Sequence, residues 1–278
     1  MSIGFSKTFG FERVLLAKAI NEFRDKANLS RTEIMSKLGV GNQKAEAIVL
    51  WLGKLGLRDN ANRQLTPLGK TLTELDPYFD ETFVQWIFHY QLASNPEAEV
   101  WYSLSNEFLP GRTLFSFDEA IDFLVSKGLR SKKDKHLRSD VSIFLKSFIS
   151  ADALGKTEYL KIESEPKRIL SKKNFYVNPP SDMSPYLIAF IIYDQRKKKL
   201  YNFSTITIEE LLILPGNVGR ILSLSRAKLE EILKLLSSPQ YDQLVYLATT
   251  AGLDQVGLKF KRNPLEILEM YFKKERRR

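Results

Sequence analysis

The chain has 278 residues, 44% of them hydrophobic and 12% aromatic, and 42 Lys and Arg against 33 Asp and Glu give a net charge of +9. This composition allows buried cores in two or three folded domains, and the absence of cysteine excludes disulfides and thiolate metal sites. No apolar run of about eighteen residues and no cleavable leader is apparent, so we expect a cytoplasmic protein with no membrane partner. The basic pI, near 9.4, favours a polyanionic partner such as DNA.

Near the start, residues 29–72 predict a winged helix-turn-helix. Ser30 and Glu33 form the two ends of a capping box for a helix over residues 31–38. The run 39–41, Gly-Val-Gly, interrupts that helix, and Asn42 is expected to cap a second helix that ends at about Leu55. The order is that of a helix-turn-helix whose second helix reads DNA.

A short polar hairpin, the wing, is expected after this second helix. Gly56 ends the helix, residues 57–66 supply the hairpin, and Pro67 and Gly69 are expected to close the module. Two interpretations remain open, because two amphipathic helices and a hairpin also form a plain packing unit. If the module binds DNA, the candidate contacts are Asn42, Gln43, Lys44, Glu46, Lys54 and Arg63.

Two aromatic-rich helices are predicted over residues 81–94 and 97–108, where large apolar side chains recur every three or four residues. We interpret them as a bridge that docks the flanking domains together. His89 lies in this run, and a lone histidine in such a setting is more typical of a packed core residue than of a catalyst.

A second helix-turn-helix-like unit is predicted from residues 117–126 and 132–148. The second of these helices combines a buried apolar stripe with a basic start, which is a favourable phosphate site. A solvated basic face is the alternative. The residues concerned are Lys132, Lys133, Lys135, His136 and Arg138.

From residue 151 onward the pattern changes to short strands, at 159–162 and 175–178, followed by helices at 185–193, 208–214, 226–236 and 265–272. The loop 214–220 ends at Arg220 and either directs backbone N–H groups toward a phosphate or is a plain turn. We therefore predict a mainly α protein with minor β (α+β): a winged helix over 1–76, a helical bridge with a second helix-turn-helix-like unit over 77–150, and an α+β domain with a basic tail over 151–278.

Signals for catalysis are weak. Residues 39–44 lack the spacing of a nucleotide-binding loop, and two distant histidines without cysteine do not supply a zinc site. Two acidic groups are weak candidates for Mg²⁺ or Mn²⁺, although acids are favoured at helix starts regardless of chemistry. These groups are Asp76, Asp80 and Glu81, and Asp118, Glu119 and Asp122.

Several short motifs occur in order along almost the whole chain. They are Lys7-Thr8-Phe9, Leu38-Gly39-Val40-Gly41 with Trp51, Leu65-Thr66-Pro67-Leu68-Gly69, Leu92-Ala93-Ser94-Asn95-Pro96 with Trp101-Tyr102, Leu137-Arg138-Ser139-Asp140-Val141, Pro215-Gly216-Asn217-Val218-Gly219-Arg220 and Thr250-Ala251-Gly252-Leu253. In this set the chain resembles the SspB-like proteins of bacterial DNA phosphorothioation and defence. It departs from them at residues 5–9, Phe-Ser-Lys-Thr-Phe, where family members often have Gly-His-Glu-Thr-Phe.

The resemblance implies a nucleoid-associated bacterial protein that binds double-stranded DNA beside a sulfurtransferase-type protein and an ATPase. It also implies a nick in one strand, through which sulfur enters the backbone, with Mg²⁺ or Mn²⁺ as the cofactor if nicking occurs. It identifies no catalytic residue. The alternative is a non-enzymatic transcription regulator or an adaptor that recruits modification enzymes to DNA.

Overall fold

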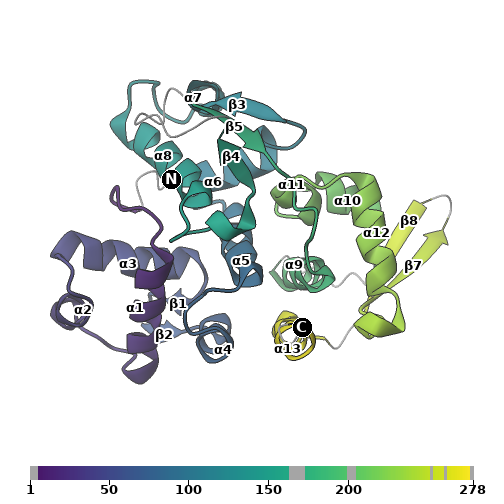
Figure 1. The fold of residues 1–278 in the computed structure, drawn as a ribbon, viewed down its shortest axis with the longest axis horizontal. Helices are drawn as coiled ribbons and strands as arrows, with labels where there is room; N and C mark the ends of the chain where they lie inside the picture. Colours follow the sequence, from purple (N-terminus) through teal and green to yellow (C-terminus); the bar gives the residue numbers. More distant parts are fainter. Residues whose placement is uncertain (1–5, 163–172, 199–204, 251–252, 260–261, 276–278) are drawn as a thin grey trace. The chain divides into compact units, whose positions relative to one another are not determined.

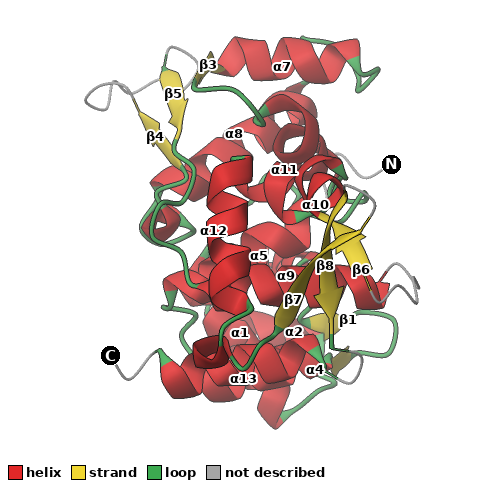
Figure 2. Ribbon diagram, turned by 90° about the vertical axis from the view of Figure 1, so that its right-hand side faces the viewer, coloured by secondary structure: helices red, strands yellow, loops and turns green. Residues whose placement is uncertain are grey.

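The computed structural model describes residues 6–162, 173–198, 205–250, 253–259 and 262–275 (Figure 1). The chain forms two compact units, one of Met1–Leu104 with Gly111–Asn178 and one of Ser105–Pro110 with Pro179–Arg278. Helices predominate and the strands form small antiparallel sheets (Figure 2), which confirms the α+β class. Both predicted domain boundaries, after residues 76 and 150, fall inside the first unit.

The first unit begins with a helical module that closes on a hairpin. α1 packs against α2, α3 and β2, and α3 contacts β1 (Figure 1). The elements are α1 (Arg13–Asp25), α2 (Arg31–Leu38), α3 (Asn42–Lys54), β1 (Arg58–Asp59) and β2 (Gln64–Leu65). The two helices and the hairpin expected between residues 29 and 66 are therefore present.

Local sequence signals explain where α2 and α3 begin and end. The Ser30 Oγ accepts the backbone N–H of Glu33, whose side chain accepts the N–H of Ser30, so the predicted capping box is confirmed. Gly39 ends α2 with φ +65°, a left-handed conformation that suits glycine. The prediction that Asn42 caps α3 is wrong. Gly41 is the N-cap, and the side-chain oxygen of Asn42 accepts instead from Arg31 at 3.3 Å.

This capping box makes the stability of the protein depend on the ionisation of Glu33. Hydrogen bonds from Lys26 and from the backbone of Ser30 lower the pKa of Glu33 to about 2. A carboxylate with a lowered folded pKa stabilises the protein above its ordinary value of 4.5, and that stabilisation disappears as the pH falls toward 2. We expect Glu33→Gln to lower the free energy of unfolding at pH 7, and the difference from wild type to shrink between pH 5 and pH 2 in urea titrations. A difference that stays constant with pH would contradict this.

The module does not close at Pro67 and Gly69 as predicted. Residues Pro67–Leu75 form another helix, α4, whose N-cap is Thr66 and whose first position is proline. Proline is well suited to that position, because the first helical N–H has no intrahelical partner. Pro67 and Gly69 therefore lie in the first turn of a further helix.

The predicted aromatic helices are α5 (Thr82–Ala93) and α6 (Glu99–Ser103), which continues as a short π-helix, η1 (Leu104–Phe108). Every residue from Phe83 to Ala93 is buried. Trp101 packs edge-on against Trp51 and Phe144, with ring centroids 6.2 and 4.9 Å away. α5 and α6 thus contribute to the aromatic core of the first unit, whereas η1 after Leu104 belongs to the second unit.

The rest of the first unit is a strand, two helices and a hairpin. Its elements are β3 (Leu114–Ser116), α7 (Phe117–Ser126), α8 (Lys135–Ile149), the 3₁₀ turn η2 (Gly155–Thr157), β4 (Leu160–Ile162) and β5 (Asn174–Val177). The sheet order is β3-β5-β4, all antiparallel. The strand predicted near 176 thus pairs with β3, the strand predicted near 160 pairs with β5, and both belong to the same unit as α7 and α8. The helix predicted from residue 132 begins at Lys135, because the Asp134 carboxylate caps it by accepting the N–H groups of His136 and Leu137.

The second unit repeats this order of elements. A strand, β6, is followed by helices and by a hairpin whose second strand pairs with β6, giving the order β6-β8-β7 (Figure 2). The helix α9 is buried along most of its length and contacts α12 and α13. The bounds are α9 (Pro185–Lys198), β6 (Thr205–Thr207), α10 (Ile208–Ile213), α11 (Val218–Leu222), α12 (Arg226–Leu236), η4 (Pro239–Tyr241), β7 (Val245–Thr250), β8 (Leu253–Leu258) and α13 (Pro264–Lys274).

Candidate nucleic-acid interface

The candidates on α3 lie on different sides of the helix. Gln43 is exposed, and no described residue is its hydrogen-bond partner. Lys44 forms an ion pair with Glu12 at 2.9 Å. Glu46 pairs with Lys7 at 2.6 Å and with Arg31 at 3.7 Å. Ion pairs with neighbouring residues therefore partly neutralise the charged side chains of the predicted contact face.

Lys54 is the candidate least suited to DNA contact. Twelve residues of α-helix place it about 18 Å along the axis from Asn42. Its side chain is 15% exposed and pairs with Glu97 at 2.6 Å. The hydrogen bond from Lys54 lowers the pKa of Glu97, which favours the ionised form of that carboxylate.

Arg63 lies in the turn of the hairpin, exposed and with φ +55°. Arg63 lines a surface cavity together with Arg31 and Arg58. Neither of these two arginines was among the contacts predicted from the sequence. Arg58 follows Leu57 in a strand of only two residues, and nothing in that local pattern indicates that its side chain would be buried.

The basic start of α8, which we call the α8 basic cluster, comprises Lys132, Lys133, Lys135, His136 and Arg138. Lys133, Lys135 and His136 are exposed, and none of these three side chains has a polar partner among the residues described. The buried stripe of α8 faces away from them, since Leu137, Val141 and Phe144 are fully buried. The structure thus gathers three unpaired basic or titratable side chains at the beginning of one helix.

The other two members of the α8 basic cluster pair with the acids of α7. Lys132 contacts Asp122 at 2.7 Å, and Arg138 contacts Asp118 at 3.4 Å while its guanidinium lies 4.9 Å from the Phe117 ring centroid. Exposed pairs of this kind contribute only about 0–1 kcal/mol, so a polyanion can compete for the cations. Glu119 is engaged separately in a capping box with Ser116, whose backbone N–H lowers the pKa of this carboxyl.

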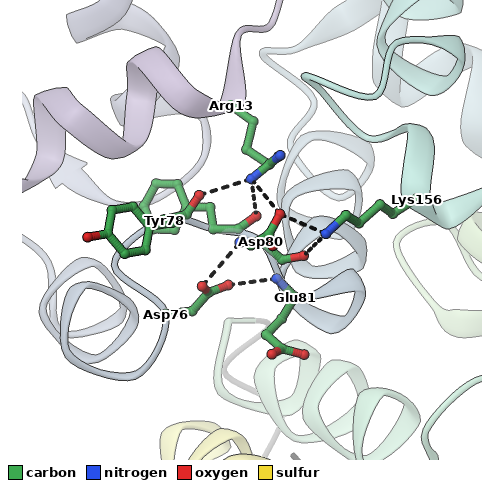
Figure 3. Close-up of polar contacts among 7 residues, drawn as sticks. Arg13, Asp76, Tyr78, Asp80, Glu81 and Lys156 are labelled. Atoms are coloured by element: carbon green, nitrogen blue, oxygen red, sulfur yellow. Dashed lines mark hydrogen bonds and ion pairs between the residues drawn. The ribbon is translucent and has the colours of Figure 1, made fainter.

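The other acidic group, at residues 76–81, holds together the backbone around it (Figure 3). The buried Asp76 carboxylate accepts the N–H groups of Asp80 and Glu81 at 3.1 and 3.0 Å. Asp80 pairs with Lys156 at 2.7 Å and with Arg13 at 3.1 Å, and both cations lower its pKa, Lys156 the more. Arg13 also donates to the carbonyl oxygens of Tyr78 and Phe79. These contacts tie α1 and the region of η2 to the turn before α5.

Neither acidic group fits a magnesium site. A divalent cation needs several oxygen ligands directed at one point, whereas backbone N–H groups or basic side chains engage the carboxylates of Asp76, Asp80, Asp118, Glu119 and Asp122. Across the described part of the chain, no three His, Cys, Asp or Glu residues come together in a way that could hold a metal. We therefore assign no metal ligand.

Three remaining predictions concern single features. His89 is fully buried, and its Nδ1 accepts the indole N–H of Trp101 at 3.0 Å, which is the packed role expected. Arg220 lies in α11 and donates to the carbonyl of Ile213, while the N–H of Gly216 donates to the side chain of Asn106, so these two donors of the loop 214–220 have partners within the protein. Of the basic tail, Lys274 pairs with Asp242 at 2.6 Å, and residues 276–278 lie outside the described residues.

Comparisons with known proteins show what this fold is similar to. A family described as proteins of unknown function, DUF4007, matches residues 6–272. A magnesium ion-bound crystal structure of SspB superposes with a TM-score of 0.80 at 17% identity, covering 100% of this chain and 89% of that chain. A second SspB crystal structure gives 0.78 with the same identity and coverage. No curated protein matches in sequence. The expected resemblance to SspB is thus confirmed in the fold.

Hydropathy adds one further finding. Among the described residues, every helix is too short or too polar to cross a bilayer.

Proposed function

This chain belongs to the DUF4007 family, and we propose that it is a DNA-binding component of a bacterial DNA phosphorothioation and antiviral defence system. The observation that carries the proposal is the likeness in fold to SspB along the whole chain. The short motifs that resemble SspB-like proteins support it from the sequence. Partners of the sulfurtransferase and ATPase types, acting in the nucleoid, are part of the same proposal.

Contact with DNA is proposed mainly for the α8 basic cluster. Lys133, Lys135 and His136 are exposed and unpaired among described residues, and Lys132 and Arg138 are held only by exposed acids. Lysine and arginine side chains so placed contact phosphates and supply affinity that does not depend on sequence. On α3, Gln43 is the residue we propose for base contact.

The arrangement of the carboxylates favours a protein that binds DNA without cutting it. The SspB neighbour was crystallised with a magnesium ion, which supports metal-dependent nicking as the second candidate function. In this chain the described carboxylates do not converge on a metal position, so we derive no cleavage step. An adaptor or a regulator is consistent with that geometry.

The two functions are separated by incubating the purified chain with supercoiled plasmid in Mg²⁺, Mn²⁺ or EDTA, beside a gel-shift assay on linear duplex. We expect retarded duplex and no metal-dependent open circles. Open circles that require metal would contradict the adaptor function and support nicking. If a variant with both Asp80→Asn and Asp122→Asn still produced open circles, the metal would bind outside the two acidic groups. Absence of both binding and scission would overturn the proposed function.

A further inference from the structure

A surface cavity of about 230 Å³ lies between α2, α3 and the β1–β2 hairpin. Three arginine side chains line it, Arg31 from α2, Arg58 from β1 and Arg63 from the turn. Apolar side chains of α2 and α3 form part of the wall, and the acidic residue in the lining is Glu46. Because three guanidinium groups line this cavity, its electrostatic environment favours a bound anion.

Arg58 is the most unusual of the three. The residue is 5% exposed, and its guanidinium lies 4.5 Å from the centroid of the Phe23 ring. Its Nη1 donates to Asn60 at 2.7 Å, but its buried Nε has no hydrogen-bond partner among the described residues. A buried donor without a partner is costly, and more so on a charged group. The protein itself therefore satisfies the Arg58 guanidinium only in part.

The neighbouring acids neutralise Arg58 and Arg63 only in part, because Asp59 opposes the lowering of the Arg58 pKa but both acids have other hydrogen-bond or ion-pair partners. Glu46 is engaged by Lys7 at 2.6 Å and by Arg31 at 3.7 Å. The carboxylate of Asp59 accepts hydrogen bonds from the hairpin itself, at the N–H groups of Ala61 and Asn62 and the side chain of Asn62. Burial, followed by the like charge of Arg63, lowers the pKa of Arg58. The two cations thus repel each other across a space lined by few negative charges.

We propose that this cavity is a binding site for one phosphate-class oxyanion, held by Arg58 and Arg63 with Arg31 at the rim. Guanidinium groups suit this ligand, because their planar N–H donors bind two oxygens of a phosphoryl group in parallel. The phosphoryl group is either a free anion or part of a DNA backbone. The site itself does not depend on the proposed DNA function, since free phosphate would occupy it without DNA.

The test is titration of the full chain with inorganic phosphate, at an ionic strength held constant with chloride, followed by ³¹P NMR line broadening and by calorimetry. We expect saturable binding to wild type and roughly tenfold weaker binding to Arg63→Gln, which removes charge-assisted hydrogen bonds from an exposed side chain. Lys18→Gln removes the same charge from the exposed face of α1 and should bind as wild type does. No saturable binding to wild type, or equal binding to Arg63→Gln, would overturn the proposal.

Arg58→Gln should abolish phosphate binding, but this buried residue also supports the fold, so Arg63→Gln decides the result if the Arg58 variant is unfolded. Competition then identifies the source of the anion. Displacement of duplex by phosphate in wild type, lost in Arg63→Gln, assigns the cavity to a DNA phosphate, whereas simultaneous binding assigns it to a free anion. Phosphate binding without any duplex binding would support the site and reject the proposed function, and the reverse result would reject the site alone.

Discussion

Replacing Lys133 and Lys135 together by glutamine is expected to weaken duplex binding roughly fiftyfold at about 0.1 M salt, since each phosphate contact contributes about 0.9 to the slope of log affinity against log salt. Both side chains are exposed at the start of α8 and are unpaired among the described residues. The loss should be the same for unrelated duplex sequences, because phosphate contacts carry no sequence information. Fluorescence anisotropy with two labelled duplexes measures it.

The control is the single substitution Lys146→Gln. The substitution removes one positive charge from an exposed position on α8. Lys146 lies about 16 Å along the helix axis from Lys135. Its affinity should stay within about twofold of wild type, because at about 0.15 M salt an exposed charge a Debye length or more from the phosphates is largely screened. If the control lost half as much affinity as the double variant on a logarithmic scale, the loss per charge would be the same, and net charge, not the α8 basic cluster, would govern binding.

The largest expected effect on stability comes from Gly69→Ala. A methyl group there would lie 2.0 Å from the carbonyl oxygen and 2.9 Å from the carbonyl carbon of Leu57. The same carbonyl accepts the N–H of Thr66 at 3.0 Å, so it cannot move away without disturbing the start of α4. We expect a loss of about 3 kcal/mol in the free energy of unfolding, because overpacking against the main chain outweighs the better helix propensity of alanine.

Urea unfolding followed by circular dichroism measures this loss, with Gly10→Ala as the control. Among the described residues, no atom outside the two chain neighbours lies within 4 Å of a methyl group added at Gly10, so the control should stay within about 0.5 kcal/mol of wild type. A Gly69→Ala protein as stable as wild type would show that α4 does not pack on Leu57 as described.

Elements set by local signals were predictable from the sequence. The helices at 31–38, 117–126 and 226–236 agree with the structure residue for residue. Each is preceded by a serine, at positions 30, 116 and 225, whose side chain accepts a backbone N–H of the first turn. Capping of this kind is encoded within four residues, and periodic apolar positions confirm it.

Pairing between distant segments was not predictable in the same way. β5 pairs with both β3 and β4, and β6 pairs with β8 from a position about fifty residues earlier. Strands of three or four residues have almost no periodicity of their own. The predicted boundary at residue 150 therefore separated strands from the helices with which they fold.

The candidate site shows the same limit. The residues predicted as metal ligands on α7 and as phosphate contacts near α8 proved to be partners of one another, Asp122 with Lys132 and Asp118 with Arg138. Separations of ten and twenty residues across a helix–helix contact do not reveal such pairs in the sequence. For the same reason the burial of Arg58 against Phe23 could not be predicted from a strand of two residues.

DNA binding by this chain is tested most directly by measuring the affinity of the wild-type protein for a duplex over a series of KCl concentrations in EDTA. Binding that needs no metal and weakens linearly in log–log form, with a slope of several units, is the predicted result, since it reports several phosphate contacts. Absence of binding at low salt, or an affinity that does not change with salt, would contradict a DNA-binding function for this chain.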